Sequence, residues 1–242
     1  MRLITILIFS LMPFFAIADS KLTSPDIIAE GGRLYDKWWA EYDLTKPQST
    51  HPSYPAIGKK SGANTWRCKE CHGWDYKGAS GAYAKGSHHT GIKGVANSKN
   101  KNIREIIAIL KNNTHRYNNV MNDYGLLRIA SFLKYGQIDI SAYINKETKL
   151  VNGNTERGKT IFNESCKECH ASDGRGRNFK TANNPEYIGT VSVKNPWEAI
   201  HKIRYGQPGA FVMGDPMPHM NEQLSLKDQL NLLSYMQTLP IN

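Results

Sequence analysis

Five consecutive residues, CKECH, occur twice in this chain, and they constrain its fold more than any other feature. The copies cover residues 68–72 and 166–170, and they contain all four cysteines of the sequence. A Cys-x-x-Cys pair by itself is compatible with a redox disulfide or with half of a zinc site. Neither alternative explains why a histidine directly follows the second cysteine both times.

The spacing within each copy indicates a covalently attached haem c. Residues i, i+3 and i+4 share a face on one helical turn. Two thiols can therefore bond the two vinyl groups of a porphyrin while the imidazole reaches the iron. We expect two covalently bound haem c groups, held by Cys68, Cys71 and His72 and by Cys166, Cys169 and His170.

The N-terminus predicts export. The stretch MRLITILIFSLMPFFAIADS has one basic residue, a short apolar run and the small-residue pattern Ala16-Ile17-Ala18, as a secretory signal does. We expect residues 1–18 to be a signal peptide and the mature protein to be periplasmic. The alternative, an uncleaved membrane anchor, fits the short apolar run less well. We expect no stable membrane span after cleavage.

The charge of the chain bears on its partners. The formal net charge is +10, and the sequence shows no carboxylate pair, Ser/His/Asp arrangement or phosphate-binding loop. Outside the cytoplasm, a basic surface favours an acidic protein or a membrane surface over nucleic acid. We expect a redox protein partner that is acidic where it docks, and no nucleic acid.

Three helices are predicted in the second half of the chain. Their capping and boundary residues are Asn154 for the first helix, Asn195, Pro196 and Gly206 for the second, and Ser225 and Pro240 for the last. Residues 150–242 resemble a class I cytochrome c domain over their whole length. The resemblance rests on Gly158 and Phe162 before the motif, on Met217-Pro218 after a Gly-rich loop, and on a closing helix with an aromatic residue.

Residues 25–146 resemble the same domain more loosely, as a remodelled copy. EGGRLYDKWWAEYD matches the first helix through Gly32 and Tyr35, NIREIIAILKN matches the middle helix, and DYGLLRIASFLKYG matches the last, capped by Asp123 and closed by Gly136. The copy departs from the family by an insertion, since 32 residues separate Tyr35 from Cys68.

The resemblance implies a mainly α fold. We expect two tandem cytochrome c-like helical domains, each wrapped around one covalent haem, with long loops in the first. The predicted boundary lies near residue 148, within the linker QIDISAYINKETKLVNGN.

The resemblance also implies a sixth iron ligand for the second haem. The family places it in a Met-Pro pair about eight residues before the cap of the last helix, and Met217 stands eight residues before Ser225. Met213, Met220 and His219 are the alternatives, and methionines near an apolar pocket often serve only as packing.

For the first haem, two registers point to residue 114 or 115. Aligning Ser131-Phe132-Leu133 with Ser234-Tyr235-Met236 gives an offset of 103 residues, which places Met217 on Thr114, beside His115. Counting eight residues back from Asp123 also gives His115. We expect His115 to be the sixth ligand. The alternatives are Met121, His88, His89 or an open site, whereas His51 and His201 are expected to be structural.

Two classes of function fit these features: an electron carrier, and a haem enzyme with chemistry at the first haem, such as oxidation of a small inorganic substrate. Thiosulfate dehydrogenases use a cysteine as an axial ligand, and this chain has no spare cysteine. Di-haem peroxidases are typically longer. The aromatic, Gly-rich loops around the first haem could wall a substrate pocket, but such loops more often shield haem from water. We expect a carrier, including one that serves as the electron-accepting subunit of an oxidoreductase.

Overall fold

The computed structural model describes residues 22–209 and 217–241, so the predicted signal at 1–18 lies outside the described residues. The fold is mainly helical, as predicted. Within the described ranges there are isolated bridges but no strand, and none of the helices there is long and apolar enough to cross a membrane. The helices are α2 (Pro25–Glu41), η1 (Gly62–Trp66), α3 (Cys68–His72), η2 (Ala96–Asn100), α4 (Ile103–Lys111), η3 (Tyr117–Asn119), α5 (Asp123–Ser131), η4 (Phe132–Gly136), α6 (Thr155–Ser165), α7 (Lys167–His170), α8 (Ile188–Lys194), α9 (Pro196–Tyr205) and α10 (Leu226–Met236).

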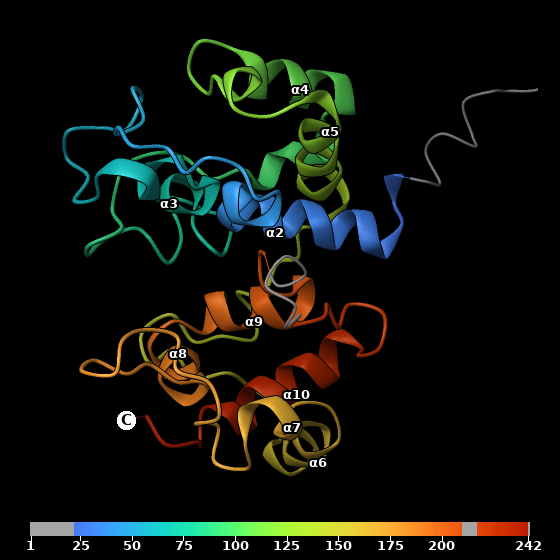
Figure 1. Ribbon diagram of the computed structural model, residues 1–242. Helices are drawn as coiled ribbons and strands as arrows, with labels where there is room; N and C mark the ends of the chain where they lie inside the picture. Colours follow the sequence, from blue (N-terminus) through green and yellow to red (C-terminus); the bar gives the residue numbers. More distant parts are fainter. Residues whose placement is uncertain (1–21, 210–216, 242) are drawn as a thin grey trace, which may run out of the picture.

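The helices form two groups, α2 to α5 and α6 to α10, and α9 faces α2 between them (Figure 1). Each group has its own cluster of buried apolar side chains, around Trp38 and Phe132 in the first and around Phe162 and Leu233 in the second. The linker contains no helix. Its residue Ile144 belongs to the second cluster, although it precedes the predicted boundary near residue 148.

In the second group, α6 and α10 cross at Gly158. A Cβ atom at this position would overlap the carbonyl oxygen of Asn231 and would lie 2.9 Å from the Cβ of Tyr235. One turn further along α6, the rings of Phe162 and Tyr235 pack with their centroids 5.3 Å apart. Glycine is therefore required at residue 158 because the two backbones touch there.

The first group repeats this crossing between α2 and α5. A Cβ atom at Gly31 would overlap the carbonyl oxygen of Arg128, and the rings of Tyr35 and Phe132 pack with centroids 5.3 Å apart. Arg128 and Phe132 stand 103 residues before Asn231 and Tyr235, so the crossing has the offset that the closing helices predict. The glycine at the crossing is Gly31, however, and not Gly32 as the sequence comparison suggested.

Gly32 contacts the other group of helices. A Cβ atom at Gly32 would lie 2.6 Å from the ring of Tyr205 on α9. Adjacent residues of a helix point in directions about 100° apart, so the two glycines open different sides of α2. This helix therefore contacts α5 through Gly31 and α9 through Gly32.

Most of the predicted helix caps are confirmed. Asn154 and Ser225 accept backbone hydrogen bonds at the starts of α6 and α10, and Asn195 and Gly206 flank α9, with Pro196 as its first residue. The predicted cap of α5 is wrong by one residue. Asn122 accepts the N–H of Gly125 and caps the helix, whereas Asp123 is its first residue. An asparagine and an aspartate side by side are both good caps, so residue type did not distinguish them.

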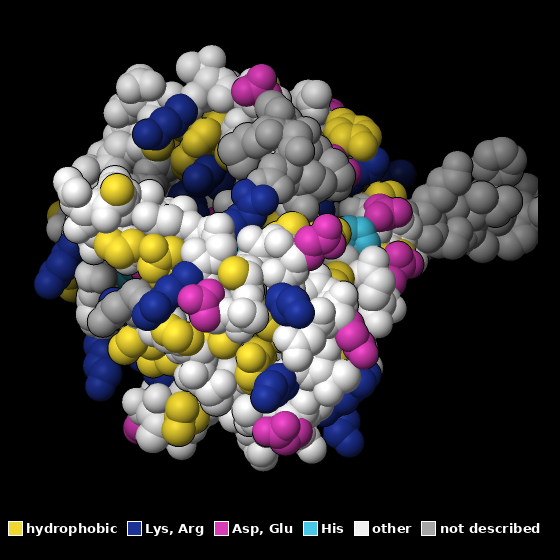
Figure 2. Space-filling model, turned by 60° about the horizontal axis from the view of Figure 1, so that its bottom comes forward, with side chains coloured by type: hydrophobic (Ala, Val, Ile, Leu, Met, Phe, Trp, Pro, Cys, Tyr) yellow, Lys and Arg dark blue, Asp and Glu magenta, His cyan; other side chains and the backbone are white. Residues whose placement is uncertain are grey.

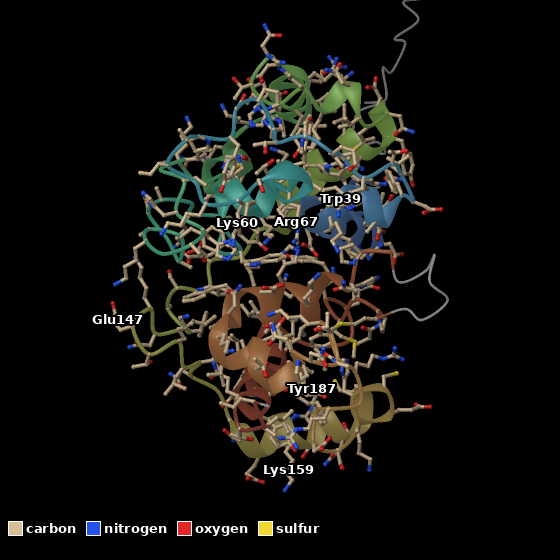
Figure 3. All side chains as sticks on the ribbon, turned by 60° about the vertical axis from the view of Figure 1, so that its left-hand side comes forward. Trp39, Lys60, Arg67, Glu147, Lys159 and Tyr187 are labelled. Atoms are coloured by element: carbon tan, nitrogen blue, oxygen red, sulfur yellow. The ribbon has the colours of Figure 1, made fainter. Side chains whose placement is uncertain are left out.

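A buried carboxylate joins the two groups. Asp36 on α2 is 1% exposed and forms ion pairs with Arg67, just before the first motif, and with Lys202 on α9. Figure 3 shows Arg67 at the boundary between the two groups of helices. Burial alone would raise the pKa of Asp36, but Lys202 and Arg67 outweigh it and hold the pKa well below its usual range.

The crossing at Gly158 predicts the effect of a single methyl group. Gly158→Ala should lower the free energy of unfolding by about 1–3 kcal/mol, because the added Cβ forces the backbones of α6 and α10 apart. The neighbouring Lys159 is exposed, and Lys159→Ala should change stability by less than about 0.5 kcal/mol. Denaturant unfolding followed by circular dichroism measures both, and equal stabilities of the two variants would contradict the contact.

The Asp36 ion pairs predict how stability depends on pH. A carboxylate whose pKa is lowered by folding stabilises the protein above its unfolded pKa of about 3.9 and loses that contribution as pH falls toward the folded pKa. Asp36→Asn should cost about 3–5 kcal/mol at neutral pH, because it leaves Lys202 and Arg67 buried without their carboxylate, and should flatten acid unfolding below about pH 4.

The surface pair Lys111–Asp123 provides the control for this experiment. The side chain of Asp123 is 80% exposed, so Asp123→Asn should leave the acid limb of the unfolding curve unchanged. Acid unfolding curves of Asp36→Asn and wild type that run parallel would refute the role of Asp36.

Candidate functional site

The first motif is itself a helix, as its spacing predicts. Helix α3 covers Cys68–His72 and ends at Gly73, whose φ of 78° only glycine adopts readily and whose N–H donates to the carbonyl oxygen of Lys69 at 2.9 Å. Arg67 precedes α3 in an extended conformation. The chain thus forms a single helical turn that contains both thiols and the imidazole.

Cys68, Cys71 and His72 line one pocket in the first group of helices. Tyr35 of α2 and Leu110 of α4 form part of its apolar wall. Further lining comes from the long insertion and from the loop after α4, through His51, Ser53, Thr65, Thr114, His115 and Tyr117. A mostly apolar pocket with a few placed polar groups is typical of an organic cofactor site.

His72 and His115 face each other across this pocket. Their ring centroids are 6.3 Å apart and the ring planes differ by 27°. Nδ1 of His72 lies 2.8 Å from the carbonyl oxygen of Lys93, so this nitrogen carries the proton and donates, which leaves Nε2 as the free ligand atom. Burial lowers the pKa of His72 to about 4 and also lowers that of His115, which keeps both rings in the neutral form that binds metals.

The spacing of the two rings fits one iron between them. A nitrogen ligand lies about 2 Å from its metal, and a ring centroid lies about 1 Å behind the nitrogen, so two imidazoles that would hold one metal ion between them would have centroids about 6 Å apart. The separation of 6.3 Å between His72 and His115 agrees with this value. The residues present therefore fit a haem with two histidine ligands.

The predicted insertion holds the loop that carries His115. Nδ1 of His51 accepts the N–H of Ser53, so its Nε2 is protonated and donates to the carbonyl oxygen of His115 at 3.0 Å. The hydroxyl of Ser53 donates to the carbonyl oxygen of Thr114 at 2.8 Å. His51 is thus structural, as expected, and its role is to position the proposed ligand. No motif or spacing near His51 indicates this contact, which spans 64 residues.

The thiols of the first motif differ from those of a redox site. Burial raises the pKa of Cys68 to about 11 and that of Cys71 to about 12, whereas reactive redox cysteines have lowered pKa values. All four cysteines are free. Among residues 22–209 and 217–241, no group of three or more His, Cys, Asp or Glu side chains is arranged to hold a metal ion by itself.

The alternative ligands for the first site do not line this pocket. Met121 is buried at another place, where its side chain packs over Gly125. His88 is paired with Glu70 at 2.7 Å, and a ring nitrogen of His89 lies 3.2 Å from the carbonyl oxygen of Tyr83. Of the predicted candidates, only His115 is brought to His72.

The second motif is continuous with helix α6. Cys166 ends α6, and α7 follows directly with Lys167–His170. His170 is 9% exposed and its ring lies 6.2 Å from that of Phe179, whereas Cys169 is exposed. Helix α6 and the second motif thus form an almost continuous stretch of helix.

Met217 lies next to the C-terminal end of α9. Its carbonyl oxygen accepts the N–H of Gln207 at 3.4 Å, and a Cβ atom at Gly206 would lie 2.6 Å from that oxygen. Among its alternatives, His219 is paired with Asp26 of α2, Met220 packs beside the second cluster, and Met213 lies outside the described residues. Residues 210–216, which lead into Met217, also lie outside them.

The comparison with protein families bears on this second site. Residues 155–240 match the family model described as cytochrome c. This match supports a cytochrome c domain in that segment of the chain. No match was found among curated proteins or among solved structures.

The matched segment includes the second motif and Met217, and it lies within the residues 150–242 that carry the sequence resemblance. A cytochrome c domain implies a covalently bound haem c and an electron-transfer protein with a redox partner. The match does not extend to the first motif. The crossing at Gly31 and the pocket of His72 are therefore the observations that bear on the first half of the chain.

Proposed function

We propose that this protein is an exported, periplasmic di-haem cytochrome c that carries electrons between redox partners. The proposal includes a carrier that serves as the electron-accepting subunit of a larger oxidoreductase. It consists of two tandem cytochrome c-like domains, residues 25–146 and 150–242. The first haem is held by Cys68, Cys71, His72 and His115, and the second by Cys166, Cys169, His170 and Met217.

The observation that carries this proposal is the pair of rings in the first pocket. The ring centroids of His72 and His115 are 6.3 Å apart, and the two thiols of the first motif line the same pocket. The repeated helix crossings at Gly31 and Gly158 support the same interpretation, because in both halves the helix before the motif crosses the closing helix at a glycine.

The side chains around the first site favour a carrier over an enzyme. A bound haem supplies one-electron redox chemistry. With His115 as a ligand, its ring would occupy the position on the iron that a substrate would need, and His51 and Ser53 hold its loop in place. Tyr35 and Tyr117 are both buried in the pocket wall and exclude water.

The ligand sets give the proposed direction of electron flow. A thioether ligand raises the reduction potential relative to imidazole. The first haem, with two histidines, would then have the lower potential, and the second, with His170 and Met217, the higher. Electrons would pass from the first haem to the second.

The second site is the better placed for docking. In the second motif Lys167 and Glu168 are exposed, and the exposed Arg175 and Lys180 follow nearby in the sequence. Figure 2 shows that Lys and Arg are spread over the face that comes forward from the bottom of Figure 1, with Asp and Glu between them. The excess of positive charge, which is +10 for the full sequence including Arg2 of the proposed signal, would steer an acidic redox partner without one dominant basic cluster.

The number of haems is the first test. Thioether bonds survive denaturation, so the intact mass of the denatured protein should exceed that of the processed chain by two haem groups. The Cys68→Ser/Cys71→Ser protein should lose one haem, and its matched control, Cys166→Ser/Cys169→Ser, should lose the other. Wild-type protein with one haem or none would end the proposal.

The sixth ligands can be tested at each haem separately. His115→Ala removes one nitrogen donor, so the first haem should become five-coordinate or water-bound and should bind carbon monoxide, while the second keeps its spectrum. Met217→Ala should remove a sulfur-to-iron band and lower the higher of the two potentials. Optical spectra and redox titrations measure both effects.

His89→Ala is the control, because His89 does not line the pocket. Its spectrum should match that of wild type. If the His115→Ala spectrum also matches wild type, the assignment is wrong, and Met121, His88 or an open site gives the better account. Carbon monoxide binding by the wild-type first haem would favour the haem enzyme.

A further inference from the structure

We propose that electrons cross between the two haem sites through a defined chain of contacts in which Tyr35, His201 and Tyr205 are the central residues. The inference rests on the proposed function and deepens it, because it says which side chains connect the two sites. Each link from His72 to Met217 is a covalent bond, a hydrogen bond or a ring contact of the structure.

The chain of contacts begins beside His72. Gly73 follows His72 directly, and its carbonyl oxygen accepts a hydrogen bond from the hydroxyl of Tyr35 at 2.7 Å. Tyr35 is fully buried, and its ring lines the pocket together with Cys68 and His72. The first site is therefore connected to the interior of α2 by two covalently linked residues and one hydrogen bond.

The path of contacts then crosses from α2 to α9 through His201. The ring of His201 lies 6.0 Å from that of Tyr35 and 4.8 Å from that of Tyr205, measured between centroids. His201 is 1% exposed. The ring contacts between the two groups of helices are therefore made in the interior, away from bulk solvent.

Both nitrogens of His201 are used, which fixes its ring. Nδ1 lies 2.9 Å from the hydroxyl of Tyr76, and Nε2 lies 2.9 Å from the carbonyl oxygen of Gly32. The carbonyl can only accept, so Nε2 carries the proton and Nδ1 accepts from Tyr76. Burial lowers the pKa of His201 to about 3, so the ring stays neutral at neutral pH.

The path of contacts ends at the proposed ligand of the second haem. Tyr205 is the last residue of α9 and is followed by Gly206 and Gln207, whose N–H donates to the carbonyl oxygen of Met217 at 3.4 Å. Gly206 has a φ of 82° and allows this approach, since a Cβ there would lie 2.6 Å from the same oxygen. The backbone after α9 thus reaches the residue that would bind the iron.

The proposed step moves one electron and no proton. With both haems bound, the first iron would be oxidised from the ferrous to the ferric state as the second is reduced from ferric to ferrous. His201 keeps Nε2 protonated throughout, because both of its nitrogens stay in the same hydrogen bonds. Contact and bonding along the chain, rather than a charged intermediate on His201, would set the rate.

Two substitutions at His201 separate ring contact from hydrogen bonding. His201→Phe keeps a ring and loses both hydrogen bonds, whereas His201→Gln keeps a donor and an acceptor and loses the ring. After pulse reduction of the full di-haem protein, electron transfer between the haems should be an order of magnitude slower in His201→Gln and close to wild type in His201→Phe. Trp197 lies one turn earlier on α9 and is not part of the proposed path of contacts, so Trp197→Leu should leave the rate unchanged.

The outcomes decide the proposal. A wild-type rate in His201→Gln would overturn it, and so would equal slowing in both variants, because hydrogen bonds rather than the ring would then control the rate. If neither variant folds with two haems, Tyr35→Phe decides, because it loses only the hydroxyl that is hydrogen-bonded to Gly73. A slower electron transfer in this variant supports the proposed path of contacts, and an unchanged rate refutes it. Wild-type protein with one haem, or without internal transfer, would instead refute the proposed function.

A second readout does not depend on electron transfer. Nitrogen NMR of the fully reduced protein should show Nε2 of His201 protonated and Nδ1 unprotonated through neutral pH, and Tyr76→Phe should shift the Nδ1 resonance alone. A ring that becomes doubly protonated near neutral pH would overturn the electron-only step.

Discussion

The close contact of α2 with two other helices is the constraint on which the rest of the structure depends. Gly31 lets α2 touch α5, and Gly32 lets it touch α9. Tyr35 lies one turn after Gly31 and therefore on nearly the same side of the helix, where it reaches both the first pocket and His201. A side chain at either glycine would push α2 away from α5 or from α9. It would therefore move Tyr35 relative to the first pocket or to His201.

Buried charge then fixes how α2 lies against α9. Removing Asp36, Arg67 and Lys202 from water is costly, and their mutual attraction repays this only when every charge keeps its partner. The carboxylate of Asp36 serves both cations, one from each group of helices. Few other relative positions of the two groups would satisfy all three, so the ion pairs select one arrangement even where their net contribution to stability is small.

The sequence was sufficient to predict local structure and less so for contacts between distant segments. The caps at Asn154 and Ser225 and the offset of 103 residues follow from residue types and spacing that act within a turn or two. With Asn122 as the cap of α5, both registers reach Thr114 instead of His115, yet it is the ring of His115 that faces His72. Loop geometry decided between the two neighbours, and this depends on His51, which is 64 residues away.

Contacts between the two groups of helices were the least predictable. His201 follows the pattern of a buried residue on a helix, and nothing near it in the sequence indicates that Gly32 and Tyr76 are its hydrogen-bond partners. The functions of Gly31 and Gly32 could not be separated for the same reason. Periodicity shows that a residue is buried, but it does not show against which segment.

The two copies of CKECH show how far one short sequence can differ in its surroundings. In the first copy Lys69 and Glu70 are buried and paired with each other, and His88 also binds Glu70, whereas Lys167 and Glu168 of the second copy are exposed. The cations near the first site would by themselves raise its reduction potential, because they disfavour the more positive oxidised haem. Most of that effect would be cancelled. Asp36 offsets one of the two positive charges of Arg67 and Lys202, and Glu70 offsets the charge of Lys69.

What remains is the difference between axial ligands. Axial ligands shift haem potentials over a range of about 0.8 V. Because the buried cations around Asp36 and Glu70 are mostly paired, we expect their effect on the potential to be the smaller one. In the proposed ligand sets the imidazole of His115 therefore decides the order of the two potentials, and the buried ion pairs modify it without reversing it. The first site would then be the donor because of one loop histidine, and the second, with its exposed motif, the place where electrons leave the protein.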